Sequence, residues 1–452
     1  MAVVVCVTVW AGSSLLAVGF AVVGALVAWG IERSFVLAAV CIALAAAGAV
    51  LSNGAWHDAQ PRRLGPYTGW AEVVGDPAPF GTSVRVTLEI DGERFDAWVY
   101  GSPRRRLSPR QAGDQVYISG VRAATTQHPR RAQVRHVVGR FTVAFVGDVL
   151  AGSPLDRASA RIRGALRATA EQSMAAPDAA LFSGLVIGDD ARQPPTMTDA
   201  FRSSGLSHLT AVSGQNLALL LAAAAPVLRR LRPMPRCFVS IGLIAWFMAL
   251  TRFEPSVLRA GVMAMLAVSG FVLGRRQAPI RLLSIAVVVL VLVDPLLVWS
   301  VGFWLSVGAT MGVCLVGPWL AERLPGPRWL AVALGVTLGA QVGVVVPSFL
   351  VFHRLPLVSI PANLLAVPVA GAVMLYGLPA GLLAAPLPAA VSAVLMWPAA
   401  VGTHWVSVVA ALGARVEPSA GWSWGGWVII VAAISVAVRR GPRPSGIGES
   451  PP

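Results

Sequence analysis

The chain of 452 residues is 56% hydrophobic and only 13% charged, whereas soluble globular domains are about 25% charged. Its mean hydropathy is +0.69, and apolar runs of about 20 residues recur along it, which excludes an ordinary soluble domain and indicates a polytopic membrane protein. All the basic side chains are arginine and the formal net charge is +15, so the chain favours anionic partners, first the lipid headgroups of a bilayer and then nucleic acid.

Two apolar runs occupy the N-terminal part of the chain. The run over residues 2–30 has no basic segment ahead of it, and a second run over 34–51 follows almost at once. This pattern favours two transmembrane helices over residues 1–55 rather than a cleaved signal peptide. The four cysteines lie within or at the start of apolar segments without CxxC or metal-ligand spacing, so we interpret them as small residues of the membrane core.

Residues 60–150 are charged, punctuated by proline and glycine, and β-like. Hydrophobic residues alternate with polar ones from Val84 to Ile90 and again from Phe95 to Val99, which is the period of a half-buried strand. Asp91-Gly92 between these runs is a two-residue hairpin signal. Further strands are expected over residues 69–75, 114–121 and 134–145. About five short strands predict a small all-β, OB-like barrel, with a small sandwich as the alternative.

Basic and aromatic side chains gather in this domain. Arg104, Arg105, Arg106 and Arg110 fall in one expected loop, and Arg130, Arg131 and Arg135 fall in another. OB-folds bind single strands through a basic groove and stacking aromatic rings. The candidates for contacting a strand outside the membrane are therefore Trp98, Tyr100 and the first arginine group. Packing of Trp98 against the membrane or a neighbouring domain is the alternative.

An amphipathic helix is expected over residues 153–176. Ser153 is a good N-cap, Pro154 suits the first helical position, and Asp156 stands three residues after the cap. Apolar side chains share one face of this helix and arginines share the other, as in helices that lie in the membrane interface. Packing of the helix on the barrel is the alternative.

Residues 178–440 are nearly continuous membrane sequence, followed by a tail over 441–452 that we expect to be disordered in the cytoplasm. Several apolar runs are short or broken by proline and glycine, which at membrane depth requires surrounding protein or a water-filled cavity and is common in transporters. The expected spans are 205–228, 237–250, 255–273, 282–298, 301–320, 329–349, 356–383, 391–411 and 425–438. The predicted fold is therefore a mainly α-helical polytopic membrane protein with a small inserted OB-like domain.

Three arginine-rich loops set the expected orientation. They fall within residues 229–236, 275–281 and 439–443, and the positive-inside rule places all three in the cytoplasm. With Glu32-Arg33 as a tight inner turn, the β domain then lies on the outer side of a plasma membrane that the chain crosses many times.

The densest polar stretch of the membrane region runs from Phe201 to Asn216, shortly after Gly188-Asp189-Asp190. Arg259 interrupts another apolar helix. Ionisable side chains are costly within a bilayer, so they usually serve a transport pathway or a specific partner.

These segments resemble, in order and spacing, the signature motifs of the ComEC/Rec2 competence family. Each motif is weak alone, but the set is specific and spans roughly residues 60 to 400. The matching segments are LVIGD at 185–189, GLSHL at 205–209 with VSG at 212–214, PSVLRA at 255–260, DP at 294–295 with GFWLS at 302–306, and FH at 352–353 with PL at 356–357 and PANLLAVP at 361–368.

The resemblance implies a channel that carries single-stranded DNA into the cytoplasm during natural transformation. It also implies partners that deliver DNA outside and a cytoplasmic motor. A moving strand needs arginines for its phosphates and a helical bundle able to enclose water. The DNA-path candidates are Arg202, Ser207, His208, Thr210, Ser213, Gln215, Asn216 and Arg259. For the small residues, close helix packing is the alternative.

Two departures from the family pattern limit the transfer of roles. Asn216 stands where the family often has histidine. Many relatives also carry a metallo-β-lactamase-like nuclease domain with an HxHxDH zinc motif, and none of the six histidines here makes that spacing. We therefore expect a short form without that domain, with no cofactor, no metal and no enzymatic activity.

Other functions stay open from the residues alone. Ser213-Gly214 faintly resembles an intramembrane serine protease with His208 or His353 as base, although a serine and a histidine five residues apart on one helix are poorly aligned. A transporter of another solute, such as a lipid or a polyanion, is the second alternative. A relative in a host that does not take up DNA is the third.

Overall fold

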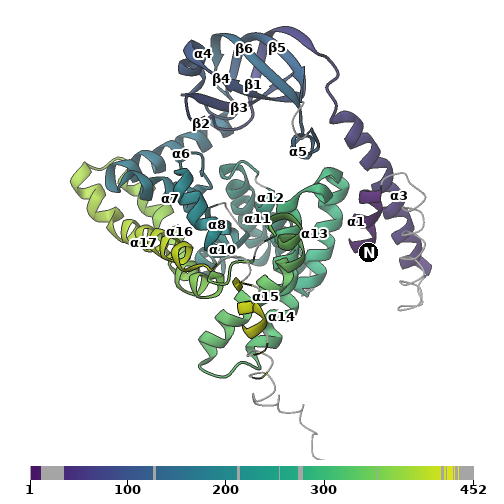
Figure 1. Ribbon diagram of the computed structural model, residues 1–452, viewed down its shortest axis with the longest axis vertical. Coiled ribbons are helices and arrows are strands. Elements are labelled where there is room, and N and C mark those ends of the chain that lie inside the picture. The colour runs from purple at the N-terminus through teal and green to yellow at the C-terminus, as the bar shows by residue number, and fades with distance from the viewer. Residues whose placement is uncertain are drawn as a thin grey trace, which may run out of the picture. The chain divides into compact units, whose positions relative to one another are not determined.

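The computed structural model describes residues 2–11, 35–125, 129–210, 214–253, 255–272, 278–353, 355–418, 422–423, 425–430, 432 and 436. Within them the chain is mainly helical and carries one small β domain, as the sequence predicts (Figure 1). The chain divides into two compact units. The first comprises Met1–Leu166, Phe238–Met265 and Ser284–Ser300, and the second comprises Arg167–Cys237, Leu266–Leu283 and Val301–Pro452.

Six strands of the first unit form one sheet that closes into a barrel. The order is β1-β5-β6-β4-β3-β2, and an additional β1–β3 pairing joins the sheet to itself. β4 and β6 run parallel, and the other pairs are antiparallel. With the short β2 set aside, the strands follow the order of a five-stranded OB barrel, which confirms the OB-like prediction over the sandwich. The strands are β1 (Gly65–Val73), β2 (Ala78–Phe80), β3 (Ser83–Ile90), β4 (Glu93–Val99), β5 (Gln115–Ala124) and β6 (Val137–Leu150).

The β3–β4 hairpin forms as the sequence predicts. Asp91 and Gly92 have φ values of 53° and 77°, the left-handed pair of a type I′ turn, whose twist matches that of the flanking strands. This turn fixes the register and sets Arg85 opposite Trp98. The alternating hydrophobic residues consequently point into the barrel. Its core contains Ala71, Val73, Val86, Leu88, Ile90, Phe95, Ala97, Val99, Leu107, Val116, Ile118, Val138, Phe141 and Val146.

The two arginine groups that were expected in loops lie in or beside short helices instead. α4 (Gly101–Leu107) follows β4, and α5 (Pro129–Gln133) lies between β5 and β6. Each helix has one buried hydrophobic residue, Leu107 in α4 and Ala132 in α5. Burial of that single side chain against the barrel stabilises a turn of helix where the charged sequence suggests a loop.

α6 (Pro154–Ser173) covers most of the expected amphipathic helix. Leu166 and Thr169 of the expected apolar face are buried, but Leu155 on that face is 56% exposed, and Arg163 is only 6% exposed. Arg163 turns inward because its guanidinium donates hydrogen bonds to the Asp76 carboxylate and the Leu250 carbonyl. Ion pairing, rather than hydrophobicity alone, therefore selects the inner face of this part of α6.

α1 (Ala2–Ala11) and α3 (Phe35–Asp58) lie side by side in the first unit (Figure 1). Three tryptophans meet at their ends. Trp10 stacks on Trp299 with ring centroids 5.7 Å apart, and Trp56 meets the same ring edge-on at 5.6 Å. This aromatic contact joins both helices to the short 3-10 helix η1 that carries Trp299.

The rest of the chain is a series of helices of very different length. The shorter ones are α7 (Ala176–Ile187), α8 (Pro195–Ser203), α9 (Ser207–Thr210), α10 (Gly214–Leu228), α13 (Pro279–Val293) and η1 (Pro295–Trp299). The longer ones are α11 (Pro233–Leu250), α12 (Pro255–Val272), α14 (Val301–Ala321), α15 (Arg328–Phe352), α16 (Ser359–Ala384) and α17 (Ala389–Val416).

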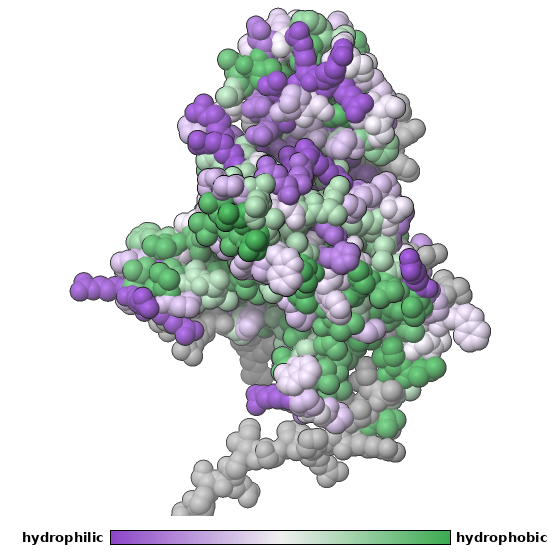
Figure 2. All heavy atoms as spheres, turned by 90° about the vertical axis from the view of Figure 1, so that its left-hand side faces the viewer, coloured by the Kyte–Doolittle hydropathy of each residue, from purple (hydrophilic) through white to green (hydrophobic). Residues whose placement is uncertain are grey.

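Six helices within the described ranges are long and apolar enough to cross a bilayer, which fits a polytopic membrane protein. Figure 2 shows mainly hydrophobic side chains on the helices and many hydrophilic side chains on the barrel. The six segments are Ala39–Asp58, Pro233–Leu250, Val301–Ala321, Arg328–Val351, Ser359–Ala384 and Ala389–Val416. Shorter apolar helices accompany them.

Two expected spans are not single helices. The span predicted over 205–228 is divided between α9 and α10, and residues 211–213 lie outside the described residues. The span predicted over 282–298 ends at Val293, because the Asp294 carboxylate accepts a hydrogen bond from the Leu296 N–H at 3.1 Å and starts η1. Parts of the first and last expected spans also fall outside the described residues.

α14 and α15 pack backbone against backbone. Gly308 and Gly312 of α14 face Gly343 and Gly339 of α15. A Cβ atom added at Gly312 would collide with the carbonyl oxygen of Gly339, and one at Gly308 with that of Gly343. Small residues are what allow membrane helices to approach so closely, so this pair depends on glycine at these positions.

Candidate nucleic-acid interface and polar helical segment

A depression of about 420 Å³ on the barrel is lined mainly by arginines. Four arginines and one carboxylate face it, which leaves an excess of three positive charges, and Trp98 adds an aromatic ring. We call it the arginine pocket. Its lining residues are Arg85, Asp96, Trp98, Thr125, Arg131, Ala132, Arg135, Val137 and Arg140.

Strand register brings these residues together. The β3–β4 hairpin sets Arg85 opposite Trp98, and the parallel β4–β6 ladder sets Asp96 opposite Arg140. α5, which interrupts the chain between β5 and β6, contributes Arg131. The strand residues point outward because the residues beside them in each strand fill the barrel core. The pocket is therefore a product of the barrel topology.

Asp96 organises the arginines of the pocket. Its Oδ2 accepts hydrogen bonds from Arg85 Nη2 at 2.7 Å and Arg135 Nη2 at 2.8 Å, and its Oδ1 accepts one from Thr87 Oγ1 at 2.8 Å. Burial alone would raise the pKa of Asp96. The hydrogen bonds from Arg85 and Thr87 and the charges of both arginines outweigh burial, so the pKa lies below its usual value.

The pocket keeps donors for an external anion. Each guanidinium carries five N–H groups, and the Asp96 contacts use one Nη group each of Arg85 and Arg135. Among the residues that the structure describes, neither Arg131 nor Arg140 forms an ion pair. Convergent arginines are the preferred ligands of phosphate, because the planar fork matches two phosphate oxygens.

Trp98 is held beside these arginines. The guanidinium carbon of Arg85 lies 5.6 Å from the centre of the Trp98 ring, and Phe80 meets the ring edge-on at 4.9 Å. Trp98 thus packs within its own barrel and presents part of its ring to the pocket. A fixed aromatic ring next to convergent positive charge is the arrangement on which single-stranded nucleic acids stack. Tyr100, at the start of α4, is 59% exposed.

The arginines expected to contact a strand lie elsewhere on the barrel. Arg104, Arg106 and Arg110 each donate a hydrogen bond of 2.7–2.9 Å to a backbone carbonyl oxygen. Arg105 is exposed on α4. None of these four lines the arginine pocket. The contacts of Arg104, Arg106 and Arg110 help to hold α4 and its flanking turns on the barrel.

The polar residues expected along a DNA path fall mostly in α8, α9 and α10 of the second unit. The side chains of Ser207, His208 and Gln215 are exposed. Arg202 is exposed as well and pairs with Asp199, one turn earlier in α8, at 3.1 Å. These four side chains are accessible to a passing ligand.

Other members of the predicted path have structural partners. Thr210 is buried, and its Oγ1 donates to the Ser207 carbonyl at 2.9 Å. Asn216 Nδ2 donates to the Leu185 carbonyl at 3.1 Å and so ties α10 to α7. Ser213 lies outside the described residues.

Arg259 is set apart from the other path candidates. It belongs to the part of α12 in the first unit, and it is only 2% exposed. A buried arginine is costly unless polar groups of the protein pair with it.

The acidic motif after α7 anchors the start of the second unit. Gly188 has φ 70° and ends α7 in the left-handed conformation that favours glycine. Asp189 is 5% exposed and pairs with Arg167 of α6. A second pair joins Arg192 to Glu171 of the same helix. These contacts explain the polar GDD segment as a structural anchor.

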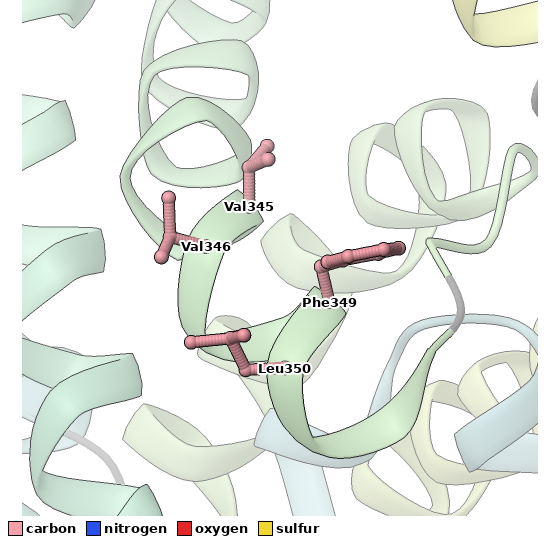
Figure 3. A pocket seen from close by; sticks show the side chains of 4 residues that line it. All are labelled: Val345, Val346, Phe349 and Leu350. Atoms are coloured by element: carbon pink, nitrogen blue, oxygen red, sulfur yellow. The ribbon is translucent and has the colours of Figure 1, made fainter.

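An open apolar depression of about 520 Å³ lies along α15. Val345, Val346, Phe349 and Leu350 line it, and Figure 3 shows all four side chains projecting from consecutive turns of this one helix. The lining contains only hydrocarbon, so it suits acyl chains of a bilayer and offers no group for chemistry. Across the described ranges, no three His, Cys, Asp or Glu residues gather as a metal site would require.

Part of the arginine pocket could have been predicted from the sequence. A two-residue turn at Asp91-Gly92 implies that Arg85 pairs with Trp98, because the register follows from the turn length. The arginines of α5 were visible as a basic cluster. Arg140 could not be placed, because its position depends on the parallel β4–β6 pairing between strands far apart in the chain.

These features define a class, a helical polytopic membrane protein that carries an OB-like barrel with a basic pocket. The chain belongs to the Competence protein family, which it matches over residues 185–443. The family acts in DNA uptake. The matched region contains the polar segment from α8 to α10 and most of the helices of the second unit.

Two curated proteins are similar to parts of the chain. It is 28% identical over 200 residues to "ComE operon protein 3" of Bacillus subtilis (strain 168), covering 43% of this chain and 25% of that protein. It is 27% identical over 209 residues to "Uncharacterized protein YcaI" of Escherichia coli (strain K12), covering 42% of this chain and 27% of that protein. The chain thus spans about a quarter of the length of these relatives. No solved structure matches it.

Proposed function

We propose that this protein carries single-stranded DNA across the plasma membrane during natural transformation, and that the arginine pocket of the barrel is where the strand is first bound. The observation that carries the proposal is the pocket itself, four arginines around Trp98 on an OB-like barrel of a Competence family chain. The proposed activity is transport and requires no catalytic group.

The chemistry of the pocket suits a strand with exposed phosphates and bases. Arg131 and Arg140 offer whole guanidinium groups to phosphate, and release of counterions from the strand favours binding at low salt. Trp98 offers a surface on which any base stacks, so the pocket selects for single strands without reading their sequence. A duplex hides the faces of its bases and lacks this second interaction.

Contacts within the first unit support the proposed orientation. The barrel meets the chain just beyond the end of α11, where Arg252 donates hydrogen bonds to the Ala112 carbonyl and the Asp76 carboxylate, and it meets the end of α13, where His136 contacts Asp294. The arginine-rich segment 229–236 lies at the other end of α11. An apolar helix that crosses a bilayer has its ends on opposite sides, so a cytoplasmic arginine segment puts the barrel outside.

The helical region is then the proposed conduit. Ser207, His208 and Gln215 are the accessible polar candidates along it, together with Arg202. Machinery that brings DNA to the barrel and a motor that draws the strand inward are proposed partners. The anionic bilayer is the other expected partner of this basic chain.

Strand binding by the full chain in lipid nanodiscs tests the proposal. Replacing Arg131 and Arg135 together with alanine is expected to weaken binding of a fluorescent single strand. The slope of log affinity against log salt is expected to fall by about 1.4, because each lost phosphate contact contributes about 0.7. The double variant is also expected to lower transformation frequency in a competent host.

The matched control removes two arginines outside the pocket. Arg62 pairs with Asp58 and Arg94 pairs with Glu89, so replacing both with alanine changes the net charge equally without touching the pocket. Equal losses in both double variants would contradict a specific interface. Unchanged transformation by linear DNA after deletion of the gene would contradict the uptake role and favour transport of another polyanion or a lipid.

A further inference from the structure

Among the described residues, two polar contacts that differ in kind join the barrel to helix ends of the first unit. One is centred on Asp76 in the loop after β1, and the other is the pair between His136 and Asp294. The two contacts differ in burial and in the number of hydrogen bonds, and this difference assigns them different roles.

The Asp76 contact is a fixed attachment. Its carboxylate accepts hydrogen bonds from the Ala112 N–H at 3.1 Å, from Arg163 Nε at 3.3 Å and from Arg252 Nη2 at 3.2 Å. The Arg163 side chain is 7% exposed, and those of Asp76 and Arg252 are each 18% exposed. Arg163 also binds the Leu250 carbonyl at the end of α11. Opening this contact would leave buried charges without partners, which is energetically costly.

The His136–Asp294 contact is built to open. A single contact of 3.0 Å joins His136 Nε2 to Asp294 Oδ2, and the two side chains are 46% and 23% exposed. His136 has φ 57°, in the left-handed region that is unfavourable for a residue with a side chain. Water replaces a single partly exposed pair at little cost.

This weak contact lies directly beside the arginine pocket. His136 stands in the chain between Arg135 and Val137, which both line the pocket, and Arg135 binds Asp96 within it. On the other side, the Asp294 carboxylate caps η1 through the Leu296 N–H. The contact therefore connects the pocket rim with the corner between α13 and η1.

We propose that the His136–Asp294 contact is a latch that holds the barrel in a resting position and is released when a DNA strand occupies the arginine pocket. A phosphate bound by Arg135 competes with Asp96 for its guanidinium and shifts the backbone that carries His136. The barrel stays attached at Asp76 while the α13–η1 corner is freed. The inference rests on the strand binding of the proposed function.

Thermodynamic linkage predicts that removing the latch increases the affinity for the strand, whereas most mutations near a binding site lower it. If strand binding must open the latch, removing the latch by mutation makes binding tighter, because the bound state no longer has to break that contact. His136→Ala is expected to raise the affinity of the full chain for a single strand about threefold, the effect of losing one partly exposed hydrogen bond. The slope against log salt is expected to stay unchanged, because no phosphate contact is lost.

Three further variants complete the test in nanodiscs. Asp294→Ala is expected to give the same gain, and the double variant with His136→Ala is expected to give no more than either alone, because both remove one contact. His136→Gln keeps a side-chain N–H donor and is expected to bind like the unmodified protein. Misfolding lowers affinity, so it cannot imitate the expected gain.

The outcomes separate this inference from the proposed function. Unchanged or weaker binding by His136→Ala, or additive gains in its double variant, would overturn the latch even where replacing Arg131 and Arg135 together weakens binding as proposed. An unmodified chain that binds no single strand would overturn both. In hydrogen exchange, faster exchange at residues 295–300 on adding the strand is expected for the unmodified chain, and no change there would also overturn the latch.

Discussion

The barrel and the helical region use similar polar side chains in different ways. In the barrel, arginines from β3, from α5 and the turn after it, and from β6 converge on one depression, where the Asp96 carboxylate holds two of them, Arg85 and Arg135. In the helical region, Thr210 and Asn216 give their hydrogen bonds to backbone carbonyl groups. The comparison teaches that a polar residue amid apolar sequence marks a structural contact as often as a ligand site, and that convergence of charges is the better sign of an interface.

The two regions also differ in how they pack. The barrel core is filled by large side chains such as Phe95 and Phe141, which strand alternation turns inward. α14 and α15 instead bring glycine backbones into contact, with no side chain between Gly312 and Gly339. Hydrophobic burial stabilises the first region, whereas within a bilayer close backbone contact must do that work.

The largest expected effect concerns the attachment of the barrel. Asp76→Asn is expected to lower the free energy of unfolding by about 3 kcal/mol, because two arginines would face a neutral amide in a mostly buried site. Thermal unfolding in detergent measures it. Asp58→Asn removes an exposed pair with Arg62 and is the matched control, with a loss expected below about 1 kcal/mol. Equal losses would mean that the Asp76 contact is no stronger than a surface pair.

Packing in the helical region is tested next. Gly312→Ala is expected to destabilise the protein by about 2 kcal/mol, because the added methyl group meets the Gly339 carbonyl and forces α14 and α15 apart. Gly242→Ala in α11 is the control, since an added methyl group there meets no atom within 4 Å. Accumulation in membranes and unfolding in detergent report the difference. A harmless Gly312→Ala would contradict backbone contact as the basis of this helix pair.

A smaller effect is expected at Asn216. Asn216→Ala is expected to cost about 1 kcal/mol of stability through loss of its hydrogen bond to the Leu185 carbonyl. Transformation is expected to fall only as far as the amount of folded protein falls, because the Asn216 amide is already bound to the backbone of α7. A tenfold loss of transformation at normal protein level would instead place Asn216 on the DNA path. It would contradict the view that the buried polar groups of the helical region serve mainly as structural contacts.

The smallest expected effect is an acid dependence of the barrel. Burial raises the pKa of Asp96, but its bonds to Arg85 and Thr87 and the nearby arginine charges hold the pKa below the unfolded value. A depressed folded pKa contributes stability above the unfolded pKa of about 3.9, and that stability is lost as pH falls through the folded pKa. Asp96→Asn is expected to flatten this part of the stability profile below about pH 4. An unchanged profile would argue against the Asp96 network.

Much of the barrel could be predicted from local sequence. Alternation from Val84 to Ile90 and the turn at Asp91-Gly92 fixed a hairpin, because side-chain period and turn length depend on adjacent residues. The apolar runs likewise predicted membrane helices, since their length against the bilayer thickness is a local property. The helices α4 and α5 were missed because each depends on one side chain buried against distant strands.

Local sequence placed the proposed site less well than the fold. Trp98, one of the predicted contact residues, lines the arginine pocket, whereas the arginines of α4 do not, and basic clusters in α4 and α5 look alike in sequence. Breaks in the helices, such as the one at Asp294, could not be predicted. In sequence, a carboxylate that caps a new helix looks the same as a single polar residue inside a continuous span.

By itself, the sequence determined the membrane character of the protein, the position of its β domain, the hairpin register and the family resemblance. Only the tertiary structure decided which arginines meet in one pocket, why Arg163 turns inward, and which polar groups of the helices are already paired. The physical reason is that periodicity and turn chemistry act between neighbouring residues. The parallel β4–β6 pairing and the ion pairs of Asp76 join residues that lie far apart in the chain.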